Sequence, residues 1–254
     1  DRNRTSPFAF TGNKFEFRAP GSSQNCAGIC MVLNTIVADS ISTIADAIAK
    51  LPKGKFNEGL QKIIQAVIKD HKRVIFNGDG YSEAWVEEAA RRGLPNLRTT
   101  PDALAPMLSK KNLDLFSSQG VLMPKEMESR YDVFMEEYER KVQIEGRVAL
   151  EMARSMIEPS ATAEFDAVCK AVVSAKAAGV TAGVKGVKDV ATTLGKGLDE
   201  LHVQCAALEK ALTKKPADVL AAMTKLRAAV DKLEEDVDDA RWPLPKYREM
   251  LFIY

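Results

Sequence analysis

The stretch that decides how this chain begins to fold is residues 2–18, RNRTSPFAFTGNKFEFR. Two short alternating runs flank Gly12-Asn13, a two-residue turn of the kind that closes β-hairpins. Successive side chains of a strand point to opposite faces, so Lys14, Glu16 and Arg18 share one face. The sequence therefore predicts a short hairpin near residues 5–18 that has one charged face.

The opposite face of the second strand carries Phe15 and Phe17, and these side chains require a core. The charged face places one carboxylate between two cations, with Arg2 and Arg4 near in sequence. An exposed surface strand can carry such a pattern without any function, because exposed charge pairs contribute little to stability. The spacing by itself therefore leaves a structural and a functional interpretation open.

Four segments together resemble one known family, the type III glutamine synthetases. Residues 2–18 resemble the last active-site segment of that family, in which a Glu-x-Arg pair ends a strand of the catalytic barrel. The other segments are 74–82 (VIFNGDGYS), 93–104 (GLPNLRTTPDAL) and 241–248 (RWPLPKYR). The resemblance is dense to about Pro159 and returns at the tail. It implies that residues 1–145 end the catalytic domain and that residues 146–254 form a helical C-terminal extension.

The resemblance also implies roles for single residues. Glu16 matches the metal-ligand glutamate of Glu-x-Arg, and Arg18 matches the catalytic arginine that contacts substrate. Arg4 lies in the Arg-Asn-Arg pattern that holds nucleotide phosphates, and Lys14 stands where better-known types carry a phosphate-binding arginine. Asn25 matches an asparagine that opens the helix after the strand. The remaining metal ligands, the ammonium site and the closing flap of the family are expected upstream, in a longer protein.

The activity implied is the ATP-dependent ligation of ammonia to L-glutamate through γ-glutamyl phosphate, giving glutamine. Mg²⁺ or Mn²⁺ would serve as cofactor, because these hard cations prefer oxygen ligands. The implied partners are glutamate, ammonia, ATP and identical subunits in a large ring. The expected location is the cytoplasm, or an organelle if a targeting segment precedes this chain. A chain that starts inside a catalytic hairpin is expected to be truncated and inactive alone.

The amino-acid composition limits the classes of protein to which the chain can belong. Of 254 residues 46% are hydrophobic, and the formal net charge is +1, so no basic surface for nucleic acid is indicated. No stretch is expected to reach the roughly 18 apolar residues of a membrane span. The four cysteines lack the second Cys/His pair of a zinc site, and free core thiols in a reducing compartment are expected. They are Cys26, Cys30, Cys169 and Cys205.

The chain after the hairpin is predicted to be almost entirely helical. The helix of residues 24–50 is apolar all round, which is typical of a buried helix, and Ser22 or Ser23 would cap it. Further helices are predicted over 57–71, 82–92, 100–108, 112–118, 125–158 and 161–178, with a brief strand over 74–77. Thr100 is predicted as a helix cap before Pro101, and Pro159 is predicted to end or kink the long helix.

A heptad pattern covers residues 184–212 and resumes over 223–237. The two segments are joined at Lys214-Lys215-Pro216, and so short a connection implies an antiparallel pair. Three glycines should weaken the first helix by about 1 kcal/mol each relative to alanine, so this helix needs tertiary packing. They are Gly186, Gly195 and Gly197. The fold class is therefore mainly α, with one hairpin followed by a helical bundle that contains a long antiparallel helical pair.

Two other interpretations remain open. The chain could be a non-catalytic helical assembly module derived from a glutamine synthetase, with the hairpin as a remnant. A signalling coiled coil would account for the heptads but not for the first hundred residues. The tail of residues 241–254 is aromatic and apolar, and its two prolines prevent it from continuing the helix. It is predicted to dock, preferably on its own subunit near the catalytic helices, otherwise on a neighbouring subunit.

Overall fold

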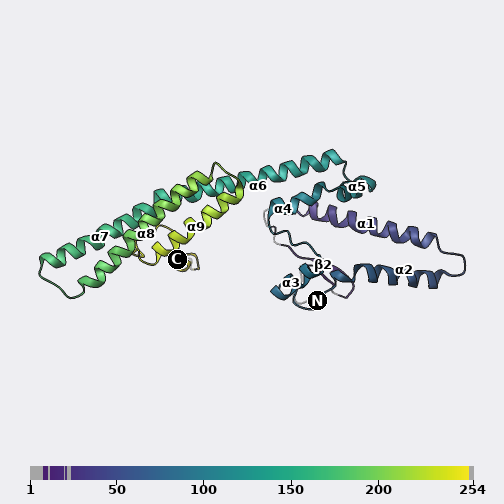
Figure 1. The fold of residues 1–254 in the computed structure, drawn as a ribbon, viewed down its shortest axis with the longest axis horizontal. Coiled ribbons are helices and arrows are strands. Elements are labelled where there is room, and N and C mark those ends of the chain that lie inside the picture. The colour runs from purple at the N-terminus through teal and green to yellow at the C-terminus, as the bar shows by residue number, and fades with distance from the viewer. Residues whose placement is uncertain (1–7, 11, 20, 22–23, 252–254) are drawn as a thin grey trace. The chain divides into compact units, whose positions relative to one another are not determined.

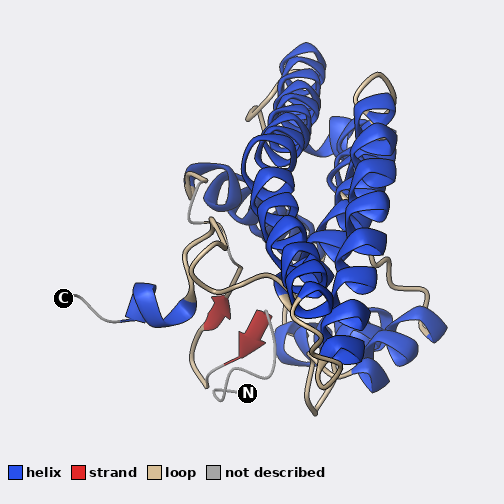
Figure 2. Ribbon diagram, turned by 90° about the vertical axis from the view of Figure 1, so that its left-hand side faces the viewer, coloured by secondary structure: helices blue, strands red, loops and turns tan. Residues whose placement is uncertain are grey.

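The computed structural model describes residues 8–10, 12–19, 21 and 24–251. The chain divides into two compact units, residues 1–135 and 136–254, and helix α6 (Pro124–Met152) passes from one into the other. Within the described residues the sheet consists of two short strands and almost everything else is helical, as the sequence predicts (Figure 2). The predicted division at residue 145, between catalytic domain and extension, remains a prediction.

The first unit starts with the hairpin of β1 (Phe8–Phe10) and β2 (Phe15–Phe17), which pair antiparallel. Because Phe10 lies opposite Phe15, four residues connect the strands, where the sequence predicted a two-residue turn. Gly12 has a φ of +100°, a conformation that only glycine adopts readily. Residues 5–7 of the predicted hairpin, and residue 11 in its turn, lie outside the described residues.

Helices α1 (Ala27–Ala49) and α2 (Phe56–His71) follow and contact each other (Figure 1). The unit continues with η1 (Lys72–Val74), α3 (Glu83–Arg91), α4 (Thr100–Leu104), η2 (Ala105–Leu108) and α5 (Lys110–Ser118). Its buried core is small: Phe116, Leu122 and Met127, with Met31 of α1 packed against them. The oxygen Asp39 Oδ1 accepts a hydrogen bond from Gln119 Nε2, which also ties α1 to the end of α5.

Helix α1 is not buried, although its sequence predicted that it would be. Thr35 is its only buried residue, whereas Val37 is 53% exposed and Ile41 is 61% exposed. By length and composition α1 would also suffice to cross a membrane, contrary to the expectation that no stretch would. Core helices of soluble proteins have the same composition. Among the residues that the structure describes, however, none covers the apolar faces on which Val37 and Ile41 lie.

Two local predictions in the first unit are wrong for identifiable reasons. The side chain that caps α4 is Thr99, not Thr100: Thr99 Oγ1 accepts the Asp102 N–H at 3.3 Å, and Pro101 lies in the first turn. The segment 74–77 forms no strand, because no neighbouring strand pairs with it. It leaves η1 as an extended segment, and other contacts hold it.

In the second unit α7 (Glu158–Ala177), α8 (Val184–Ala211) and α9 (Pro216–Glu234) pack side by side (Figure 1). The predicted heptad positions supply the core, and α8 and α9 form the predicted antiparallel pair. Leu194 and Leu208 of α8 and Val219 of α9 are fully buried. Trp242 is also buried in this core, so the first half of the tail docks on the bundle of its own chain. The tail beyond it exposes Tyr247, and residues 252–254 lie outside the described part.

The long helix does not end at Pro159. Between α6 and α7 the residues Ala153–Ile157 form a π-helical turn, in which the Glu158 N–H bonds to the Ala153 carbonyl five residues earlier. Proline lacks an N–H for the Ser155 carbonyl, and its ring would collide with that carbonyl in a regular α-helix. The wider turn just before Pro159 relieves this collision, so the helix continues.

Two helical glycines allow close helix packing in the second unit. A Cβ on Gly197 would lie 2.5 Å from Leu233 Cδ2, and a Cβ on Gly146 would lie 2.7 Å from Val219 Cγ1. Both opposing side chains are buried and have little room to move. The missing side chain at each glycine therefore permits closer helix packing. This packing offsets part of the stability that is lost because glycine has a low helix propensity.

Candidate functional site

The hairpin brings four phenylalanines together on one face. Phe8 lies opposite Phe17, and Phe10 lies opposite Phe15. The rings of Phe8 and Phe15 stack with centroids 5.2 Å apart, and those of Phe10 and Phe15 are 5.1 Å apart. All four residues are nevertheless 46–64% exposed, although their rings contact one another. The expectation that a core covers this face is not met by the residues that the structure describes.

The charged trio lies on the other face, as predicted. Arg18 Nη2 donates to Glu16 Oε2 at 2.7 Å, and Lys14 Nζ lies 3.4 Å from Glu16 Oε1. Ala9, which pairs with Glu16 across the strands, is only 2% exposed, and the Glu16 and Arg18 side chains are about one-third exposed. The hydrogen bonds from Arg18 and then from Lys14 lower the pKa of Glu16, so this carboxylate is ionised at neutral pH.

This trio can contribute to a metal and phosphate site but cannot form one alone. An ionised carboxylate is the donor type that Mg²⁺ and Mn²⁺ prefer, and a guanidinium with an ammonium suits phosphate or carboxylate oxygens. Six ligands are typical of Mg²⁺, whereas the described residues contain no group of three acidic, histidine or cysteine side chains that could hold a metal. The donor type of Glu16 therefore fits the metal, and further ligands must come from outside these residues.

Two other predicted residues adjoin the trio in sequence. Arg4 lies outside the described residues, as do Ser22 and Ser23, the predicted caps of the following helix. Asn25 lies at the start of that helix, where its side-chain oxygen accepts the Ala27 N–H at 2.7 Å. Asn25 therefore lies just before the helix, as predicted, but the N-cap position belongs to Cys26 and the Asn25 bond closes a local turn.

A polar cluster surrounds Arg92, which the sequence did not indicate as a site residue. Its guanidinium bonds to Glu88 at 2.7 Å and to the carbonyls of Arg73 and Ile75 at 3.1 and 2.9 Å. It also lies over the Trp85 ring, 5.4 Å from the centroid. The Phe76 ring stacks on the same Trp85 ring, with the two centroids 4.4 Å apart. These contacts hold residues 74–77, the segment predicted as a strand. The only indication of them in the sequence is that aromatic residues lie near an arginine.

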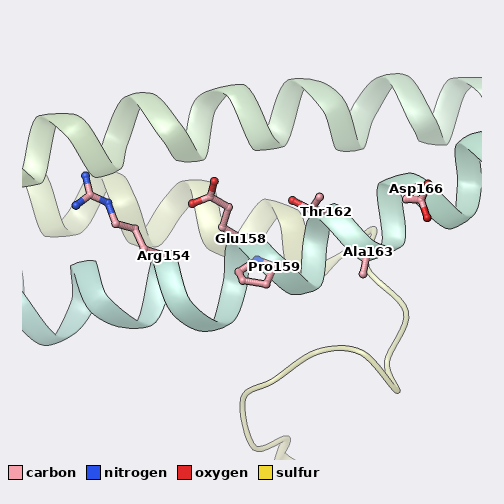
Figure 3. Close-up of a pocket in the computed structure, with 6 residues that line it drawn as sticks. All are labelled: Arg154, Glu158, Pro159, Thr162, Ala163 and Asp166. Carbon is pink, nitrogen blue, oxygen red and sulfur yellow. The ribbon is translucent and has the colours of Figure 1, made fainter.

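The exposed face of the π-turn and α7 forms an open depression (Figure 3). Its polar residues recur every four positions, which places Arg154, Glu158 and Thr162 along one side of the helix. Arg154 makes a two-pronged ion pair with Glu209 of α8, at 2.6 and 3.1 Å. Beside it Cys205 is buried, which raises the pKa of its thiol. Cys26 and Cys30, by contrast, are exposed, so the expectation that all cysteines are core thiols is wrong for these two.

Comparison with known proteins identifies relatives along the entire chain. Residues 59–176 match the family model described as the glutamine synthetase C-terminal domain. The chain is 38% identical to a type-3 glutamine synthetase of Dictyostelium discoideum, over 100% of this chain and 37% of the relative. It is 34% identical to glutamine synthetases of Bacteroides fragilis and Butyrivibrio fibrisolvens, over 99% of this chain and 37% and 38% of theirs. The chain thus spans little more than a third of the length of these relatives.

Proposed function

The chain is homologous to the C-terminal part of type III glutamine synthetases, and from this we propose that it supplies the last active-site strand of such an enzyme. The reaction is the ATP-dependent ligation of ammonia to L-glutamate, with γ-glutamyl phosphate as intermediate. The observation that carries the proposal is the Glu16 carboxylate held between Arg18 and Lys14 on one face of a hairpin.

Each member of the trio has a role that its chemistry supports. Glu16 provides one oxygen ligand to Mg²⁺ or Mn²⁺, which would draw negative charge from the phosphoryl group during transfer. Arg18 contacts the reacting carboxylate or phosphate of the substrate through its planar fork. Lys14, the most exposed of the three, offers a point charge to nucleotide phosphate, and Arg4 has the same role by resemblance alone.

The exposed apolar surface of the first unit supports the view that it completes a larger protein. The four-phenylalanine face of the hairpin and the open faces of α1 are unusually apolar for a surface. The other two-thirds of a chain as long as its relatives would cover them. On this proposal the chain has no activity alone, and the complete enzyme is a cytoplasmic ring of identical subunits that binds neither nucleic acid nor membranes.

The alternative is a helical assembly module that has lost catalysis. The self-contained bundle of the second unit favours it, because the buried core of that bundle consists of apolar residues together with the thiol of Cys205. Against it stands the charged trio, since a structural remnant has no need to keep an ionised carboxylate between two cations.

Substitution of Glu16 in the full-length protein separates the two. Glu16→Ala should abolish glutamine formation, measured as glutamate-dependent release of ADP at saturating Mg²⁺, while the thermal midpoint stays unchanged. Arg18→Lys should be nearly as damaging as Arg18→Ala, because an ammonium cannot replace a two-pronged contact. Lys110→Ala, at an exposed ion pair far along the chain, is the control that should keep full activity. Normal turnover in Glu16→Ala would refute the metal-ligand role.

A further inference from the structure

The pair of α7 and α8 extends beyond the third helix of its bundle. Helix α9 ends at Glu234, and its Leu233 packs against Gly197 of α8. The tail follows and is held to α7 by the ion pair of Arg241 and Glu164 at 3.0 Å. Past this level the two helices run on to their connection near Gly179. We call residues 170–190 the hairpin tip.

The hairpin tip exposes apolar side chains beyond the level at which α9 ends. Val173 is 67% exposed, Val180 is 50% exposed and Val190 is 38% exposed. Two helices alone leave these side chains in water, whereas a third or fourth helix would cover them.

The charges at the tip and at the end of α9 are opposite. Residues 170–190 contain four lysines and one aspartate. Residues 234–239, at the end of α9, contain five acidic residues; we call them the acidic run. Asp239 is engaged by Lys246 and Arg248 of the tail. Within the described part of the chain, the other four acidic residues have no ion pair within 4.0 Å, and neither do Lys176, Lys185 and Lys188.

The spacing of these two charged regions permits a symmetric arrangement. Lys185 lies twelve residues before Gly197 along α8, which corresponds to about 18 Å at the rise of an α-helix. If two copies lie antiparallel with their tips overlapping by this length, each tip reaches the acidic run of the other. A two-fold axis makes both contacts identical, as symmetric dimers require.

We infer that two copies of this chain associate through their α7–α8 tips as an antiparallel four-helix pair. The valines of the two tips cover one another in the centre, and at each end the lysines of one copy meet the acidic run of its partner. This inference does not depend on the proposed enzymatic function, because every residue that carries it belongs to the second unit.

A charge exchange tests the arrangement in the 254-residue chain. Variant A carries Lys185→Glu and Lys188→Glu, and variant B carries Glu234→Lys and Glu235→Lys. Each alone should dimerise at least about tenfold more weakly at low salt, because like charges then oppose each other at both ends. An equimolar mixture should recover the wild-type affinity, since both ends of the mixed dimer are again complementary. Sedimentation equilibrium gives the constants, and circular dichroism verifies that each variant is folded.

The matched control is Lys214→Glu with Lys215→Glu, which makes the same charge change at the opposite end of α8 and should leave the dimer unchanged. An unchanged affinity in A or B, or a mixture that does not recover, overturns the inference. A chain that stays monomeric but sediments with phosphatidylserine vesicles through the same lysines overturns it too, and assigns the tip to an anionic surface.

Discussion

The two units of this chain differ in how completely each buries its own apolar residues. The second unit places its heptad leucines in a continuous core, and Leu194 and Leu208 are fully buried. The first unit has a small core around Phe116 and leaves α1 and the hairpin phenylalanines exposed. The difference shows that an apolar helix sequence indicates that the helix will be covered, but it does not indicate which element will cover it. The heptad repeats of α8 and α9 indicate that these two helices pack on each other, whereas the sequence of α1 indicates no particular partner.

The largest expected effect comes from truncating one apolar residue in each unit. Leu208→Ala should cost about 2–5 kcal/mol, because it removes a fully buried side chain and leaves a cavity. Ile41→Ala in this chain should stay within about 0.5 kcal/mol, because Ile41 is already 61% exposed. Urea unfolding monitored by alkylation of Cys205, with the other three cysteines replaced by serine, measures the second unit. Far-ultraviolet circular dichroism at the same urea concentrations follows the first unit as well.

The same Ile41→Ala change in the full-length protein sharpens the comparison. If the missing two-thirds of the relatives' length covers α1, the cost there should rise toward that of a core residue. A cost near zero in both settings would mean that α1 stays uncovered, and the proposal that a longer chain covers the first unit would fail.

A smaller effect separates two glycines of α8 by their surroundings. Gly197→Ala gains about 1 kcal/mol of helix propensity but forces a Cβ to within 2.5 Å of Leu233, an overpacking that costs about 1–3 kcal/mol. Gly186→Ala has nothing within 4 Å of the new Cβ, so it should stabilise the helix by up to about 1 kcal/mol. Opposite signs in the two thermal midpoints are expected. A stabilised Gly197→Ala would mean that the α8–α9 contact relaxes easily.

Sequence alone predicted the helical pair because its signal is repeated many times along two helices. It failed where one distant contact decides the outcome. The segment 74–77 reads as a strand until Arg92, seventeen residues beyond Ile75, binds its carbonyl. The continuation of the helix through Pro159 depends on a π-turn that no pattern encodes. The contact of Gly197 with Leu233 requires knowledge of the register between α8 and α9.

The candidate site was predictable in the same uneven way. Alternation placed Lys14, Glu16 and Arg18 on one face correctly, because the period of a strand is local. It could not indicate that the charged face would be the better covered one and that the phenylalanine face would be open. That outcome depends on what lies against each face, which is the information that this third of the relatives' length does not contain.

The smallest expected effect concerns an ion pair of the second unit and its response to pH. The hydrogen bond from Arg154 lowers the pKa of Glu209 below its ordinary value of 4.5. A carboxylate whose pKa is lowered in the folded state stabilises the protein above its unfolded pKa, and this contribution is lost as the pH falls through the folded value. Glu209→Gln should therefore be slightly less stable than wild type at pH 7, and the gap should close as the pH falls below 4.5.

The Arg154→Gln background provides the control for this last effect, because it removes the partner without touching Glu209. In that background the further change Glu209→Gln should produce no pH-dependent gap, and the double-mutant cycle isolates the pair. Both side chains are about half exposed, so added salt should also shrink the gap at pH 7. A gap that persists at low pH, or that survives without Arg154, would assign the role of Glu209 to packing against α7. The second unit would then depend on apolar contacts alone, and its contrast with the first unit would be sharper.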